Sequence, residues 1–78
     1  MPTVEKIIEK MKRTPNSITF RELDRVLSNK GFDVKRQNGS HVVYHNTMNN
    51  EMLVIPKHDP IKECYIDAAL IKIGEKHE

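Results

Sequence analysis

The stretch RQNGSHVVYHN, Arg36 to Asn46, decides how the middle of the chain folds. From His41 onward the stretch is rich in residues that favour β-strands, and a Gly-Ser pair comes directly before His41. Side chains on a strand alternate between faces, so we expect His41, Val43 and His45 to share one face and Ser40 to point away. The stretch therefore predicts a strand with two histidines on the same face.

This geometry bears on the chemistry that the histidines can support. Ser40 and His41 point to opposite faces, which argues against a nucleophile-and-base pair between them. His41 and His45 lie roughly 13 Å apart on a strand, too far for both to bind one zinc ion at about 2 Å. His58 and Cys64 belong to no close pair of ligands either. We therefore expect no metal site and no cofactor.

Two further strands flank this one in the sequence. Residues 32–37 begin with alternating apolar and polar residues, and residues 52–55 form an apolar run that Pro56 ends. Three strands with short connections favour an antiparallel meander. If the loop Asn46–Asn50 is centred at Met48, His41 lies opposite Ile55 and His45 opposite Glu51.

Helices are predicted on both sides of the strands. Apolar residues recur at i, i+3, i+4 and i+7 from Val4 to Met11 and again from Ile66 to Ile73. Between them, Thr19 and Glu22 form a capping box, and Gly31 can take a left-handed cap. The order α, α, β, β, β, α predicts an α+β fold, a three-stranded antiparallel sheet with helices on one face.

Length and composition indicate one small protein domain, residues 1–78, with an additional helix in residues 1–14 and a core in residues 18–73. The single cysteine allows no internal disulfide, and the charged N-terminus lacks the apolar core of a signal peptide, so we expect a cytoplasmic protein. No apolar run approaches the roughly 20 residues that span a bilayer, and no membrane association is expected. The net charge of +2 means that any attraction to nucleic acid depends on clustered charges.

Such a cluster is predicted at one end of the sheet. The hairpin register brings the residues after Pro56 next to His41, and the first strand ends nearby. The result is a basic patch that carries imidazole groups, and Gly39 adds no side chain to it. Its members are Lys35, Arg36, Gly39, His41, Lys57 and His58. From the residues alone, an ordinary sheet face solvated by histidines and lysines explains the same pattern.

Three short motifs are spaced along the chain between Ile18 and about Ile73. They are Gly31 and Phe32 after a helix, Gly39, Ser40 and His41 on the second strand, and Pro56 and His58 after the third. With these motifs, this part of the chain resembles the HicA family of bacterial toxins. The resemblance implies a fold like that of double-stranded RNA-binding domains, cleavage of messenger RNA without ribosomes, and a cognate HicB-like antitoxin that blocks the toxin. It also implies a catalytic histidine at His41.

The chemistry of RNA cleavage suits these residues. Without a metal, the 2′-hydroxyl of RNA can act as nucleophile, which requires a base, an acid and cations near the phosphate. We assign His41 as the principal acid/base of an endoribonuclease and His58 as its partner. Contacts to RNA are assigned to Lys35, Arg36, Gly39, Ser40 and Lys57.

Several of these residues have alternative roles that involve neither catalysis nor RNA binding. His58 can instead border the last helix or bind antitoxin, Gly39 can serve the turn alone, and Lys57 can be solvated. For Tyr44 and His45 we expect packing and exposure rather than substrate contact. A non-catalytic RNA-binding module of the same fold is the alternative function.

Overall fold

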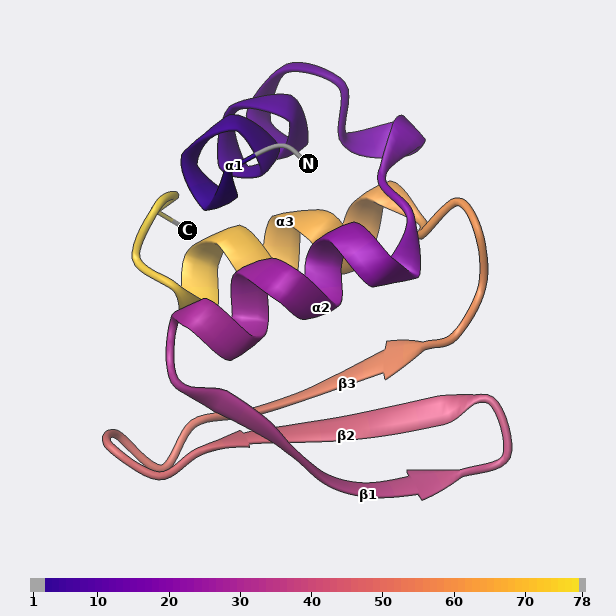
Figure 1. Ribbon diagram of the computed structural model, residues 1–78, viewed down its shortest axis with the longest axis vertical. Helices are drawn as coiled ribbons and strands as arrows, with labels where there is room; N and C mark the ends of the chain where they lie inside the picture. Colours follow the sequence, from indigo (N-terminus) through magenta and orange to yellow (C-terminus); the bar gives the residue numbers. More distant parts are fainter. Residues whose placement is uncertain (1–2, 78) are drawn as a thin grey trace.

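The computed structural model describes residues 3–77 and places its helices on one side of a three-stranded sheet (Figure 1). Met1 and Pro2, which belong to the predicted N-terminal helical segment, and Glu78 lie outside the described residues. Every predicted helix and strand is present; the short 3-10 helix was not expected. The elements are α1 (Val4–Arg13), η1 (Pro15–Ser17), α2 (Phe20–Asn29), β1 (Phe32–Asn38), β2 (His41–Asn46), β3 (Met52–Pro56) and α3 (Glu63–Lys72).

Helix α2 begins and ends as its sequence predicts. The Thr19 side chain accepts a hydrogen bond from the Glu22 backbone N–H, and the Glu22 carboxylate accepts one from the Thr19 N–H at 3.0 Å. This capping box satisfies two N–H groups that the first helical turn leaves without partners. Gly31 follows the helix with a φ of 94°, a left-handed conformation that glycine adopts without a Cβ clash.

The sheet is antiparallel in the order β1-β2-β3, which confirms the predicted meander. The predicted register between β2 and β3 is wrong by one residue. His41 lies opposite Pro56, not Ile55, and His45 lies opposite Met52, not Glu51.

The turn between these strands explains the difference. The Asn46 N–H donates to the carbonyl of Glu51 at 2.9 Å, so this pair closes the hairpin around four residues, 47–50. Asn50 takes a φ of 60°, which the short polar asparagine tolerates better than most residues. The turn is therefore centred after Met48, not on it.

A β-bulge at Lys35 changes which side chains of β1 share a face. Val34 lies opposite Tyr44, but Arg36 lies opposite Val43, so Lys35 has no partner of its own on β2. One extra residue reverses the alternation along the strand. Arg36 therefore lies on the same face as Val43 and His41.

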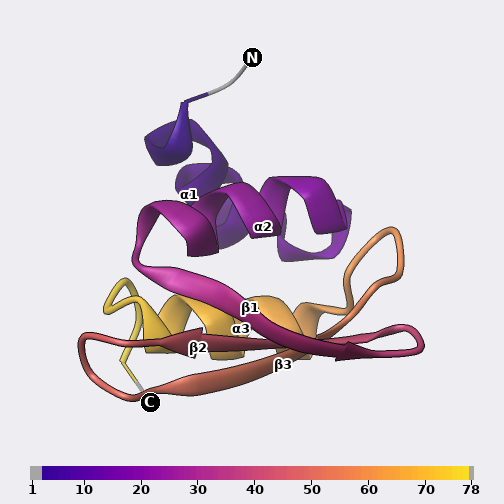
Figure 2. The ribbon, with the colours of Figure 1, turned by 60° about the horizontal axis from the view of Figure 1, so that its bottom comes forward.

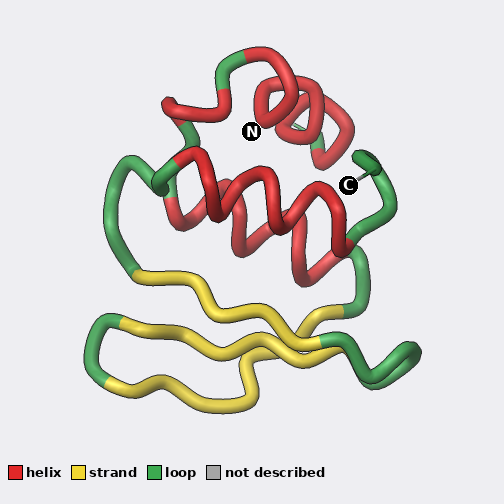
Figure 3. The backbone as a smooth tube through the Cα atoms, turned by 180° about the vertical axis from the view of Figure 1, so that it is seen from behind, coloured by secondary structure: helices red, strands yellow, loops and turns green. Residues whose placement is uncertain are grey.

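The other face of the sheet is covered by helices. Helices α2 and α3 lie directly over it, and α1 lies across them on the side away from the strands (Figures 1 and 3). Buried residues from all three helices and from the strands form one hydrophobic cluster. Its members include Ile7, Met11, Leu23, Leu27, Phe32, Val42, Tyr44, Ile55, Ile66 and Leu70.

This arrangement is compatible with the fold of double-stranded RNA-binding domains, as expected, with α1 added before the shared elements (Figure 2). Within residues 3–77, no helix has the length and apolar character needed to cross a membrane.

Candidate active site

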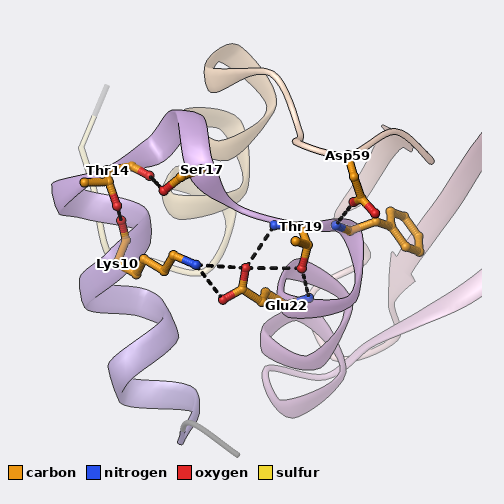
Figure 4. Close-up of polar contacts among 7 residues, drawn as sticks. Lys10, Thr14, Ser17, Thr19, Glu22 and Asp59 are labelled. Carbon is orange, nitrogen blue, oxygen red and sulfur yellow. Dashed lines mark hydrogen bonds and ion pairs between the residues drawn. The ribbon is translucent and has the colours of Figure 1, made fainter.

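One end of the sheet brings together the β1–β2 turn, the loop from β3 to α3 and the start of α2, which are far apart in the sequence (Figure 1). The Lys57 backbone N–H donates to the carbonyl of Ser40, which ties the loop to the turn. Asp59 Oδ1 accepts the N–H of Phe20 at 2.6 Å, which ties the loop to α2 (Figure 4). The predicted patch thus lies on backbone that is fixed at both sides.

His41 is the first residue of β2 and is exposed on the face that the helices leave open. Its Cα lies opposite that of Pro56 on one side and Asn38 on the other. Within residues 3–77, the histidine rings that make hydrogen bonds are those of His45 and His58. Both nitrogens of the His41 imidazole are therefore available to a ligand.

His58 lies in the loop after β3 and is also exposed. Its Nδ1 lies 3.2 Å from the carbonyl oxygen of Pro60. A carbonyl oxygen only accepts hydrogen bonds, so Nδ1 must carry the proton. In the neutral ring this leaves Nε2 with the lone pair, which is the state that a general base requires.

The two histidines do not face one common cavity. Two hollows flank His58, and the side chain of His41 borders neither. One, of about 350 Å³, is lined by Ser40, Pro56, Lys57, His58, Lys62 and Tyr65. The other, of about 560 Å³, is lined by residues of the α2 start and of the loop, among them Phe20, Arg21, Asp24, Lys57, His58 and Asp59.

The predicted cations are likewise divided. Lys57 Nζ lies 5.9 Å from the centre of the Phe20 ring, so this side chain extends toward α2. Arg36 lies on the open face with His41, and Lys35 is exposed at the bulge. Of the three predicted phosphate contacts, Arg36 is therefore the one whose position in the register places it on the face of His41.

Gly39 and Ser40 lie in the turn, not on the second strand as the sequence suggested. Gly39 has a φ of 59° at the first position of a two-residue hairpin loop, where glycine is favoured. The Gln37 side chain donates to its carbonyl at 3.1 Å. No atom lies within 4 Å of where a Cβ would stand, so the turn geometry, not crowding, accounts for glycine here.

Tyr44 and His45 are held by contacts within the protein. Tyr44 is buried, and its hydroxyl donates to Asp24 Oδ1 at 2.6 Å. Burial and then the neighbouring carboxylate of Asp24 raise the pKa of Tyr44, which keeps the hydroxyl protonated. His45 lies at the other end of β2, where its Nε2 contacts Asn50 Oδ1 at 2.8 Å.

Helix α1 supports the α2 end of the site. Lys10 Nζ lies 3.2 and 3.0 Å from the two carboxylate oxygens of Glu22, the residue that caps α2 (Figure 4). Burial alone raises the pKa of this carboxyl, but the hydrogen bonds from Thr19 and Lys10 outweigh it and lower the pKa overall. Glu22 is therefore held in its charged form.

Sequence reasoning missed the acidic and aromatic side chains beside His58. Phe20 is an apolar residue at the start of α2, yet it is only half-buried and lines a hollow. Asp59 and Asp24 had no role assigned. Asp59 was a detectable candidate, because it stands between a histidine and a proline in a polar loop, where aspartate side chains often cap backbone N–H groups. No sequence signal indicates that Asp24 reaches Tyr44.

No group of three or more His, Cys, Asp or Glu side chains in residues 3–77 is arranged to hold a metal ion. Cys64 is exposed at the first turn of α3.

A family model described as the HicA toxin of bacterial toxin-antitoxin systems matches residues 20–74. The matched region runs from α2 through α3 and contains every predicted site residue, while α1 lies before it. No curated protein and no solved structure matches the chain.

Proposed function

The chain belongs to the HicA family, toxins of bacterial toxin-antitoxin systems, and from that premise we propose that it is an endoribonuclease that cleaves messenger RNA. The family is known for messenger RNA cleavage, and its members act with an antitoxin partner. For this chain, we propose a cytoplasmic toxin that a HicB-like protein neutralises.

The proposed reaction uses the 2′-hydroxyl of the RNA as nucleophile. His41 removes its proton as the general base, the hydroxyl oxygen attacks the neighbouring phosphorus, and the 5′-oxygen of the next nucleotide leaves with a proton from a general acid. The products are a 2′,3′-cyclic phosphate and a free 5′-hydroxyl. No metal ion or cofactor takes part in this scheme.

Cations and backbone groups hold the phosphate in this scheme. Arg36 contacts the reacting phosphate on the open face. Lys35 and Lys57 contact the RNA backbone on either side of that phosphate. The turn at Gly39 and Ser40 gives the RNA room to approach. His58, whose Nδ1 proton is directed to Pro60, acts as the second acid/base group through Nε2.

The observation that carries the assignment of His41 is its exposed imidazole, with both nitrogens available, beside the loop that holds Lys57 and His58. Residues that are directly opposite on antiparallel strands have Cα atoms about 4.5–5.5 Å apart, so His41 lies close to Pro56 and to the start of that loop. A single RNA strand that crosses this end of the sheet can contact both sides.

The test is cleavage of RNA by the purified protein in excess chelator. We expect cleavage to persist and to leave a cyclic phosphate, while an RNA with 2′-deoxyribose at the cut site binds but stays intact, because it lacks the internal nucleophile. Strict dependence on a divalent ion, or cleavage of the deoxy substrate at a similar rate, contradicts the mechanism.

One observation favours the alternative, a non-catalytic RNA-binding module. His41 lies on the open face, while His58 lines the two hollows, so the acid and the base are not paired in one cavity. A protein that binds RNA in the same assay but leaves it uncut supports this alternative and contradicts the ribonuclease.

A further inference from the structure

The larger hollow beside His58 has features that fit a ligand other than phosphate. It has a volume of about 560 Å³ and lies between the first turn of α2 and the loop that follows β3. Two cationic side chains, Arg21 and Lys57, and two carboxylates, Asp24 and Asp59, line it. Because these formal charges balance, the hollow offers little selective attraction to an anion and suits a neutral polar ligand.

An aromatic ring forms one wall of the hollow. Phe20 is half-buried, and its ring centre lies 6.5 Å from that of Tyr44, which is buried behind it and packs against it. The ammonium of Lys57 lies 5.9 Å from the ring centre, at the outer limit of a cation–π contact. Such a weak contact leaves Lys57 able to turn to a phosphate and leaves the ring able to stack on a flat ligand.

The two carboxylates are each held by one oxygen. Asp24 Oδ1 accepts the Tyr44 hydroxyl at 2.6 Å, and Asp59 Oδ1 accepts the Phe20 N–H at 2.6 Å. Within residues 3–77, no hydrogen bond reaches Oδ2 of either residue. Each carboxylate is thus fixed in position and keeps one oxygen that can accept a hydrogen bond, so the matching ligand must be a hydrogen-bond donor.

We propose that this hollow binds one unpaired RNA base that carries an exocyclic amino group, and guanine best of all. Unpaired bases stack on aromatic side chains and are recognised by hydrogen bonds along their Watson–Crick edges. Guanine presents two adjacent donors on that edge, N1–H and the N2 amino group, one for the free oxygen of each carboxylate. Uracil presents one donor between two carbonyl groups, which the carboxylates disfavour.

The inference rests on the proposed ribonuclease function and adds to it a determinant of the cut site. His58 lines the same hollow, so a base held there lies next to the proposed acid/base group. The backbone of that nucleotide then lies near Lys57 and the open end of the sheet. Asp24 and Asp59 are assigned as specificity residues and take no part in proton transfer.

The experiment uses four single-stranded RNAs that differ at one position, with G, A, C or U in otherwise identical uracil-rich sequences. We expect the wild-type protein to prefer the G substrate over the U substrate in kcat/KM by at least about fivefold, the lower end of what a good pair of hydrogen bonds to one base gives. The same preference is expected in binding, measured with RNAs that carry 2′-deoxyribose at the cut site.

Asp24→Asn and Asp59→Asn test the carboxylates. Asparagine keeps Oδ1 for the Tyr44 hydroxyl or the Phe20 N–H and replaces the second oxygen with a donor. We expect the G preference to fall or reverse toward U in at least one variant. As a control, Lys35→Gln should weaken the binding of all four RNAs alike, because Lys35 lies outside the hollow and its proposed contact to the RNA backbone does not distinguish bases.

The outcomes separate this inference from the function on which it rests. If the protein cuts no RNA but its binding prefers G and loses the preference in the asparagine variants, the base site stands and the ribonuclease proposal fails. If the wild-type protein binds and cuts all four RNAs alike, or if both variants keep the preference, the base site is wrong. Thermal melting of each variant checks that it is folded, and Phe20→Leu, compared with Phe20→Tyr, supplies an independent test of stacking.

Discussion

The two faces of the sheet are made by alternate residues of the same strands, yet they differ in almost every property. The covered face carries Val42, Tyr44 and Ile55, all buried under the helices. The open face carries His41 and Val54, which are exposed, and Val43 of the central strand, which is 6% exposed. The covered face holds the fold together, and the open face is free to contact RNA. Substitutions on the covered face should therefore change stability. Substitutions on the open face, at the end of the sheet that carries His41, should change activity.

The largest effect on stability is expected from neighbours on β3. Ile55 is 0% exposed and Val54 is 46% exposed. Ile55→Ala should lower the free energy of unfolding by about 2–5 kcal/mol, because it removes buried methyl groups and leaves a cavity. Val54→Ala, the matched control, should cost less than about 1 kcal/mol. Urea unfolding of both variants measures this, and equal losses would contradict the division between the faces.

A smaller effect is expected from the hydrogen bond beneath Phe20. Tyr44→Phe keeps the ring in the core and removes the hydroxyl that donates to Asp24 at 2.6 Å. Hydrogen bonds to charged groups contribute about 1.5–3 kcal/mol, and the partial exposure of Asp24 places the expected loss near the lower end. Tyr65→Phe is the control, since the Tyr65 hydroxyl makes no hydrogen bond within residues 3–77. If the two variants melt alike, the Tyr44–Asp24 contact adds nothing to stability.

The smallest effect is expected where α1 meets α2. The pKa of Glu22 is lowered in the folded protein, so its ionised form stabilises the fold above the ordinary value of 4.5, and this contribution is lost as the pH falls through the folded pKa. Glu22→Gln keeps the capping box but loses the ion pair with Lys10, and should cost about 0.5 kcal/mol at pH 7. The difference between variant and wild type should be constant above pH 4.5 and should shrink as the pH falls through the lower folded pKa. A difference that is constant with pH contradicts the ionic origin.

The sequence predicts the covered face better than the site, for a physical reason. Helix periodicity, the capping box at Thr19 and Glu22 and the apolar strands are local signals, and all of them are confirmed. The register of β2 and β3 depends on the backbone of the turn, which closes between Asn46 and Glu51 with Asn50 in a left-handed conformation. The bulge at Lys35 had no local signal and changed which residues of β1 share the face of His41.

The site itself depends on contacts between segments that are distant in the sequence. That His41 and the Pro56–His58 segment meet at one end of the sheet follows from the hairpin and was predicted. The direction of the Lys57 side chain toward Phe20, and the place of Asp24 and Asp59 beside His58, depend on how α2 lies over the sheet. Alternation along single strands contains no information about that packing.

The most direct test of the account compares His41→Ala with His45→Ala, two histidines on the same face of the same strand. Both variants should melt close to the wild type, and for His41→Ala the change should be within about 0.5 kcal/mol, because this side chain is exposed. RNA cleavage should fall by about 10²-fold or more in His41→Ala, with RNA binding largely retained, and should stay near the wild-type rate in His45→Ala. If folded His41→Ala protein cuts RNA at close to the wild-type rate, His41 is not the catalytic residue and the central claim is wrong.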